Sequence, residues 1–278
     1  MSELIQFNGQ EIRQIEQDGQ IYFSVIDVVA VLSNSRNPND YWYRVKKRDS
    51  ELSTICRRLK LMAPDGKSRE TDCANRQGIL RIIQSIPSPN AEPFKRWLAE
   101  VGEQRLQEVD DPSLAMDRVR ESFRDLGYPD DWIETRIRTK KGRLELTAEW
   151  QKRGIHKQRE YAELTAILSG AAFGVIPSDH KQIKGLGKEN LRDHMTREEL
   201  IFTELAELQT KREAIEDDAQ GLEENKEAAR KGGVAAGKAR EAFEEETGRK
   251  VVSSSNFLAQ IKAAKKRLLG KNKEDTES

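Results

Sequence analysis

The residues that could carry catalysis are few and scattered in this 278-residue chain. Residues 232–238 approach a phosphate-binding loop, but Ala239 stands where such a loop needs the Ser or Thr hydroxyl that binds magnesium. The segment also follows a polar helix pattern, whereas a phosphate-binding loop follows a buried strand. We therefore predict a glycine-rich turn between two helices here, and no nucleotide site.

Two further groupings lack a required partner. Asp130 and Glu134 resemble the acidic metal site of restriction-type nucleases, but their spacing is too short and Arg136 replaces the lysine of that site. The three histidines have no metal-ligand spacing and are predicted to be surface or capping residues: His156, His180 and His194. No nucleophile is paired with a base. We expect no catalytic residue, no metal site and no cofactor, and hence a protein that is not an enzyme.

Charge and cysteine content narrow the class of protein. Lys+Arg and Asp+Glu tie at 48 each, so the net charge predicts no partner. Cys56 and Cys73 are too few for a disulfide scaffold, and we expect two small buried side chains in a reducing cytoplasm. No apolar run approaches the ~20 residues of a membrane span, and the N-terminus lacks the pattern of a signal peptide. We expect a cytoplasmic protein without a membrane partner.

Basic residues concentrate between residues 36 and 60, where eight basic and three acidic side chains give a local net charge of +5. Cations neutralise phosphates, and aromatic rings can pack on sugars or bases. A solvated helix face explains the charge equally well, and Trp42 is better interpreted as a core residue. The predicted DNA contacts lie in this block and in the hairpin after it, with the cations on phosphates and one of the tyrosines on a base or sugar: Tyr41, Tyr43, Arg44, Lys46, Lys47, Arg48, Arg57, Arg58, Lys60, Lys67 and Arg69.

Short hairpins must position part of this surface. Residues 3–23 have the pattern of short strands, and Asp18-Gly19 between them predicts a hairpin turn. A second hairpin is predicted to turn at residues 64–66, Pro-Asp-Gly. A turn centred on Asp65-Gly66 places Cys73 opposite Arg58.

Helices separate and follow the two hairpins. Ser24 and Asp27 match a capping box that opens one helix. Pro38 is placed to open the next, which carries the basic block. Apolar residues at helical spacing in 79–86 and 94–101 predict two more.

The acidic, proline-containing stretch 108–112 predicts a domain boundary, and no strand is predicted beyond it. Helices are predicted over 146–153, 160–168 and 190–194, with later ones capped by Thr196 and Glu199 and by Ser255 and Asn256. Residues 207–230 carry eight acidic and four basic side chains, typical of a solvated or protein-facing helix. Residues 262–273 carry six basic ones, which either add phosphate affinity or have no partner.

The N-terminal pattern resembles a known family. Ile12-Arg13, Asp18-Gly19, the run Phe23-Ser24-Val25-Ile26-Asp27-Val28 and then Asn39-Asp40-Tyr41-Trp42 with its basic run resemble the Bro N-terminal domain of baculovirus repeated-open-reading-frame proteins and phage antirepressors. Residues 78–87 and 94–98 are similar to the closing helices of that domain. The resemblance covers residues 3–105 and implies DNA binding.

The remainder resembles a second group. Residues 146–155, 185–195 and 237–251 are similar to the helical region of DNA damage-inducible protein D and related prophage-type proteins. This resemblance implies a link to the bacterial damage response or to prophage control, and it leaves the regulatory role open.

The sequence therefore predicts an α+β protein. A small Bro-type DNA-binding domain with short hairpins and helices is expected at residues 1–108, followed by a mainly α-helical domain at 112–278. DNA is the partner expected for the first domain, and a regulatory protein or a second copy of the chain for the helices of the second. The alternative is an antirepressor-like adaptor that acts by protein–protein interaction without direct DNA binding.

Overall fold

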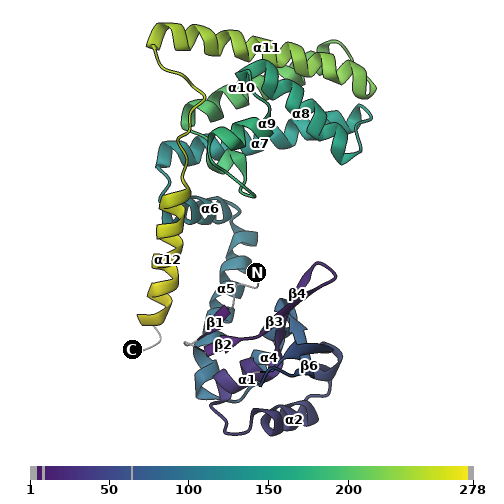
Figure 1. The fold of residues 1–278 in the computed structure, drawn as a ribbon, viewed down its shortest axis with the longest axis vertical. Coiled ribbons are helices and arrows are strands. Elements are labelled where there is room, and N and C mark those ends of the chain that lie inside the picture. Colours follow the sequence, from purple (N-terminus) through teal and green to yellow (C-terminus); the bar gives the residue numbers. More distant parts are fainter. Residues whose placement is uncertain (1–4, 8–9, 64, 275–278) are drawn as a thin grey trace. The chain divides into compact units, whose positions relative to one another are not determined.

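The computed structural model describes residues 5–7, 10–63 and 65–274. The chain forms two compact units, Met1–Leu114 and Ala115–Ser278. Among the described residues, strands lie in the first unit alone, and the second unit is helical (Figure 1). The predicted α+β class is confirmed. The predicted boundary stretch, residues 108–112, covers the end of the last helix before the junction of the units.

The first unit is built on a small antiparallel sheet with the strand order β3-β4-β6-β5, beside a separate β1-β2 ribbon. Its elements are β1 Ile5–Phe7, β2 Gln10–Ile12, β3 Gln14–Gln17, β4 Gln20–Ser24, α1 Val25–Ser33, α2 Pro38–Arg48, α3 Glu51–Thr54, β5 Arg57–Met62, β6 Ser68–Asn75, α4 Arg76–Gln84, the 3-10 turn Pro89–Ala91 and α5 Glu92–Asp110. The predicted order of strands and helices is confirmed, except that the short helix α3 was not predicted. Residues 3 and 4 of the first predicted strand lie outside the described residues.

The first hairpin turns where the sequence predicts it. Asp18 and Gly19 both have positive φ, 54° and 72°, between the paired residues Gln17 and Gln20. A two-residue turn of this hand matches the right-handed twist of the flanking strands, and Asp-Gly adopts it at little cost.

The predicted capping box at the start of α1 forms only in part. Ser24 Oγ accepts a hydrogen bond from the Asp27 amide at 3.3 Å, as expected of an N-cap. The Asp27 carboxylate, however, binds the Arg13 guanidinium at 2.8 and 2.6 Å, and the Ser24 amide donates instead to the Arg13 carbonyl at 2.9 Å. The acid that the sequence assigns to a local cap therefore joins α1 to the segment between β2 and β3.

The two faces of the sheet have different partners, because successive strand residues point to opposite sides. Phe23 and Ala74 lie in the main core of the unit with apolar side chains of α1, α2 and α4. Tyr22 and Cys73 lie on the opposite face in a smaller cluster with Leu61. Cys73 is buried as predicted, but Cys56 is only partly buried, and neither cysteine forms a disulfide.

The second unit is a helical bundle with longer helices than the sequence patterns indicate. Its elements are α6 Ser113–Asp125, α7 Asp130–Lys152, α8 Gln158–Phe173, α9 Pro177–Ile183, the 3-10 turn Leu191–Asp193, α10 Arg197–Glu216, α11 Gly221–Thr247 and α12 Leu258–Glu274. The predicted helix at 190–194 is wrong, because this segment is a single 3-10 turn. The capping box that opens α10 is confirmed, with Thr196 and Glu199 in the predicted positions.

Helices α7 and α10 run in the same direction and are joined by ion pairs at seven-residue intervals. The pairs are Asp131–Arg197 at 2.8 Å, Arg138–Glu204 at 2.7 Å and Glu145–Lys211 at 2.9 Å. Seven residues are two helical turns, so each pair returns to the same line along both helices. The contact between the helices is therefore in register over most of α10.

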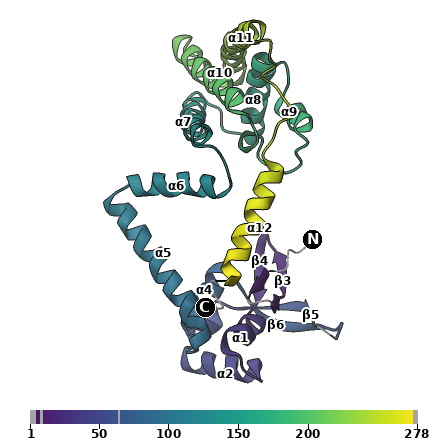
Figure 2. The same cartoon turned by 90° about the vertical axis from the view of Figure 1, so that its left-hand side faces the viewer.

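The predicted glycine-rich turn is wrong, because residues 232–238 lie inside the long helix α11. A β-carbon on Gly232 would collide with Thr210 of α10, and one on Gly233 would come within 2.6 Å of the Leu168 carbonyl of α8. The glycines thus allow the backbone of α11 to approach both neighbouring helices, which lie beside it in both views (Figures 1 and 2). Glycine serves close packing here instead of a turn.

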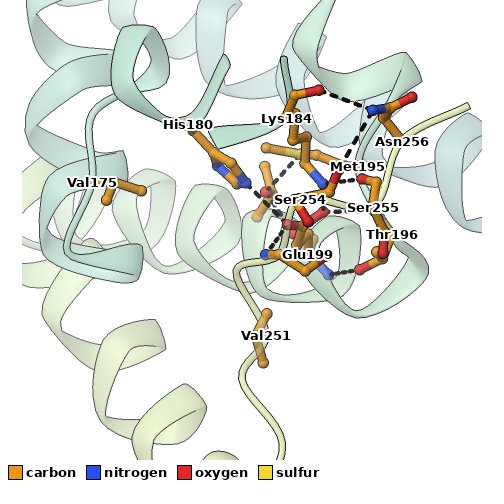
Figure 3. A network of polar contacts seen from close by, with 12 residues as sticks. Val175, His180, Lys184, Met195, Thr196, Glu199, Val251, Ser254, Ser255 and Asn256 are labelled. Atoms are coloured by element: carbon orange, nitrogen blue, oxygen red, sulfur yellow. Dashed lines mark hydrogen bonds and ion pairs between the residues drawn. The ribbon is translucent and has the colours of Figure 1, made fainter. Parts of the chain in front are cut away.

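A buried ionic cluster fixes the segment between α11 and α12 (Figure 3). Glu199 accepts a hydrogen bond from Lys184 Nζ at 2.7 Å and lies 3.0 Å from His180 Nε2, and all three side chains are fully buried. The Ser253 amide also donates to Glu199, and Lys184 donates to the Ser255 carbonyl at 2.7 Å. Burial alone would raise the pKa of Glu199, but these hydrogen bonds hold it below its ordinary value.

The histidines differ in their surroundings. The prediction for His180 is wrong, because its ring is fully buried and its partner Glu199, nineteen residues away, meets it only in the folded bundle. His194 is buried, and its Nδ1 accepts a hydrogen bond from the Phe257 amide just before α12. His156 is exposed, as predicted.

Candidate nucleic-acid interface

The basic block lies largely on α2, and local signals define both ends of that helix. Asn37 accepts a hydrogen bond from the Asp40 amide at 3.1 Å, and Pro38 occupies the first helical position. Trp42 and Val45 are buried in the core, so Trp42 is a core residue as predicted. The last turn carries three successive cations at the negative end of the helix dipole.

The two tyrosines of α2 differ in accessibility. Tyr43 is 62% exposed. Tyr41 packs against the core, and its hydroxyl is buried without a hydrogen-bond partner among the described residues. Tyr43 is therefore the ring that α2 offers to solvent.

Asp72 of β6 anchors α2 to the sheet. Its carboxylate accepts hydrogen bonds from Trp42 Nε1 at 2.8 Å and from Lys46 Nζ at 2.7 Å. Burial opposes the charged form of Asp72, but hydrogen bonds from Lys46 and Trp42 lower its pKa below the ordinary value. The charge of Lys46 is thus balanced by a partly buried partner. The sequence patterns did not predict that Asp72 would hold α2 against the sheet. The one signal for this role is the position of an acidic residue in a strand that pairs with a basic strand.

The three cations of the last turn of α2 have different partners. Lys46 binds Asp72, and Arg48 donates to the Ser85 carbonyl beyond α4 at 2.9 Å. Lys47, between them, is exposed and has no ion-pair or hydrogen-bond partner in the described part of the chain. Arg44 forms an exposed pair with Asp40 at 3.2 Å.

In the second hairpin, the pairing of the two strands is shifted by one residue from the predicted pairing. The Ala63 amide donates to the Lys67 carbonyl, and the Gly66 amide donates to the Ala63 carbonyl, each at 2.9 Å. Gly66 has a φ of +77°, the conformation that glycine supplies at the end of a three-residue hairpin loop. Cys73 consequently faces Arg57, and the predicted pairing with Arg58 is wrong.

This register distributes the hairpin cations over both faces. Arg58 and Lys60 lie on the face of Asp72, toward α2, and stand opposite Asp72 and Glu70 respectively. On that face Arg58 makes only loose ion pairs, at 3.7 Å with Asp72 and 3.9 Å with Glu70. The structure therefore brings Lys46, Arg58 and Lys60 together on the α2 side.

The opposite face of the hairpin carries the other predicted contacts. Arg57, Lys67 and Arg69 alternate there with residues of the first face. Arg57 lies over the Tyr22 ring at 5.5 Å and 3.6 Å from Asp18, and Arg69 pairs with Asp65. Lys60 and Lys67, like Lys47, have no ion-pair partner among the described residues. The predicted contacts thus form a helix and a projecting ribbon with cations on both sides, and not a single flat patch.

In the described ranges, no group of three or more His, Cys, Asp or Glu side chains is arranged to hold a metal ion. None of the helices of the described chain is long and apolar enough to span a membrane.

The order of strands and helices around this surface agrees with a known family. Residues 11–107 match the model of the BRO family, N-terminal domain. The first unit contains a Bro-N domain. Bro-N domains occur in phage antirepressor-like regulators, which suggests a DNA-binding regulatory role. No curated protein matches the chain.

Proposed function

We propose that this protein is a non-enzymatic DNA-binding regulator that contacts DNA through α2 and the β5–β6 hairpin of its Bro-N domain. The observation that carries the proposal is a set of three exposed lysines, Lys47, Lys60 and Lys67, without ion-pair partners among the described residues. A cation of this kind can neutralise a phosphate without first giving up a protein partner, and binding then gains the full counterion release.

The remaining predicted contacts have graded roles in this proposal. Arg57 and Arg58 make loose exposed pairs that a phosphate can replace. Lys46 and Arg48 hold α2 in place and act mainly as positioning residues. Tyr43 is the ring available to a sugar or base. A two-stranded ribbon has the dimensions that a DNA groove admits.

In this proposal the helical unit binds the regulatory partner. Its helices bind a regulatory protein or a second copy of the chain, in a cytoplasmic prophage or damage-response setting. The resemblance of residues 146–155, 185–195 and 237–251 to damage-inducible and prophage-type proteins supports this assignment.

A salt titration of DNA binding tests the proposed surface. The triple variant Lys47→Glu, Lys60→Glu, Lys67→Glu removes cations that form no ion pair in the described fold, so the domain should remain folded. We expect a large loss of affinity, and a salt slope smaller in magnitude by about 2.7, since each phosphate contact contributes about 0.9. The matched control, Lys140→Glu, Lys141→Glu, Lys188→Glu, changes net charge equally on the second unit and should keep the wild-type slope.

Two outcomes would contradict the proposal in different ways. If the triple variant binds with wild-type affinity and slope, the contact surface lies elsewhere. If the wild-type protein binds neither duplex nor single-stranded DNA at low salt, the antirepressor-like adaptor, acting through protein–protein contact alone, is the better assignment.

A further inference from the structure

Helix α10 exposes a regular apolar stripe. Ile201, Leu205, Leu208 and Ile215 follow one another at intervals of four, three and seven residues, the spacing of one face of a helix in a coiled coil. They are 40%, 37%, 63% and 48% exposed, although α10 lies within the bundle of the second unit. Arg212 occupies the remaining position of the stripe.

This stripe is additional to the face that holds α10 in its own bundle. Leu200, Thr203, Glu207, Thr210 and Ala214 form the buried side, where α7, α8 and α11 pack. Single exposed apolar residues are common on protein surfaces, but a repeated row on one helix is typical of an interface. The row therefore points to a second set of contacts.

Charges beside the stripe are self-complementary. Arg197, Glu204 and Lys211 alternate in sign at seven-residue intervals along the edge next to α7, where each already pairs with a residue of that helix. When two copies of α10 lie antiparallel across a two-fold axis near residues 206–207, Glu204 of each copy faces Lys211 of the other. The same alignment places Leu205 of one copy against Leu208 of the second.

We propose that this protein forms a homodimer in which the exposed stripes of two α10 helices pack antiparallel. The occupant is a second copy of this chain, because the antiparallel alignment sets Glu204 against Lys211 twice and so links the Arg138–Glu204 and Glu145–Lys211 pairs of both copies. A two-fold interface presents the same patch twice. The proposal deepens the partner-binding part of the proposed function and does not depend on DNA binding.

Sedimentation equilibrium of the full-length chain tests the dimer with one variant and one matched control. Leu208→Glu places a charge in the centre of the stripe, and Leu144→Glu changes a leucine of equal exposure, 63%, on α7. We expect a wild-type dimer, a dissociation constant raised by roughly tenfold or more in Leu208→Glu, and an unchanged value in Leu144→Glu. Circular dichroism should show the same helix content for all three, because both leucines are exposed.

The outcomes separate the proposal from its alternatives. A wild-type chain that is monomeric at the highest soluble concentration overturns it, and so does a dimer weakened equally by both substitutions. The affinity of Leu208→Glu for a short duplex is measured separately. It reports on the DNA surface alone, so failure of the dimer and failure of the DNA surface can be distinguished.

Thiol cross-linking determines the orientation of the helices. With Cys56 and Cys73 replaced by serine, Leu208→Cys lies near the two-fold axis and should be joined by a short cross-linker. Ile201→Cys should not, because the antiparallel alignment separates the two positions by about 16 Å along the helices. Equal cross-linking of both variants would show a parallel pair and overturn the antiparallel arrangement.

Discussion

At the scale of single residues, Asp72 determines where the basic helix of the Bro-N domain lies. Its carboxylate joins the indole of Trp42 and the ammonium of Lys46 to strand β6. Both donors are on α2, whereas Asp72 is on the hairpin that carries the other cations. One acid therefore aligns the two halves of the proposed DNA surface.

Asp72→Ala should lower the free energy of unfolding of the first unit by about 1–3 kcal/mol, because it leaves the Trp42 N–H and the Lys46 ammonium without a partner. Urea unfolding followed by tryptophan fluorescence measures the change. Glu70→Ala is the matched control: Glu70 lies on the same face of β6 but its side chain is 60% exposed. A loss as large in the control would show that charge, and not this contact, stabilises the unit.

The same contact has a defined pH dependence. The pKa of Asp72 is lowered in the folded chain, so its contribution is complete at neutral pH and is lost as pH falls below the ordinary carboxyl value of about 4. The difference in stability between the wild type and Asp72→Ala should accordingly shrink as pH falls from 5 toward the folded pKa. A difference that stays constant over this range would contradict the assignment.

The roles of residues that act on their sequence neighbours could be predicted, whereas the roles of residues whose partners are remote in sequence could not. Pro38 and Ser24 act within a few positions of themselves, and both were placed correctly. Asp27 and His180 were misassigned because their partners, Arg13 and Glu199, are brought to them by the fold. The DNA-contacting role of the basic residues remains a prediction.

At the scale of elements, α11 shows how packing overrides propensity. Glycine inside a helix costs about 1 kcal/mol relative to alanine. That cost predicted a turn at residues 232–238, but the helix continues because α10 and α8 approach its backbone at these positions. The sequence pattern of this segment alone cannot show that the helix continues, since the close approach that favours glycine comes from the neighbouring helices.

Gly232→Ala should therefore lower the stability of the second unit by roughly 1–3 kcal/mol, because the added methyl group meets the Thr210 backbone and side chain. Gly142→Ala in α7 is the control: nothing lies within 4 Å of the added carbon, so helix propensity alone should raise stability by about 0.5–1 kcal/mol. Thermal unfolding of the two variants gives the signs. If both substitutions stabilise the protein, the close approach of α10 and α11 is wrong.

At the scale of the whole molecule, the class of fold was predictable because hairpin turns and helix patterns segregate along the sequence. The zero net charge of the chain conceals this division, since a basic block lies in the Bro-N domain and an acidic one in α10 and α11. The helix-to-helix contacts of the second unit were not predictable, because they depend on interlocking surfaces from segments more than sixty residues apart.

Two copies joined through α10 should bind long DNA more tightly than a single copy, because the second domain binds at high local concentration. Leu208→Glu should then weaken binding to a long duplex by roughly tenfold or more and leave binding to a short, one-site duplex unchanged. Gel-shift titrations on the two lengths test this. Equal losses on both duplexes would mean that the substitution disturbs the DNA surface itself.

The ionic cluster around Glu199 has a consequence for the order in which the chain can fold during synthesis. The first unit has all its described contacts available once residue 114 has been made, so it can fold while the ribosome is still adding helices. In the second unit the buried pair of Glu199 and Lys184 lacks two of its hydrogen bonds until Ser253 and Ser255 have emerged. Burial of an ion pair is favourable only when further hydrogen bonds satisfy its remaining polar groups. The Bro-N half of the protein is thus finished first, and the helical half closes only when the segment before α12 arrives.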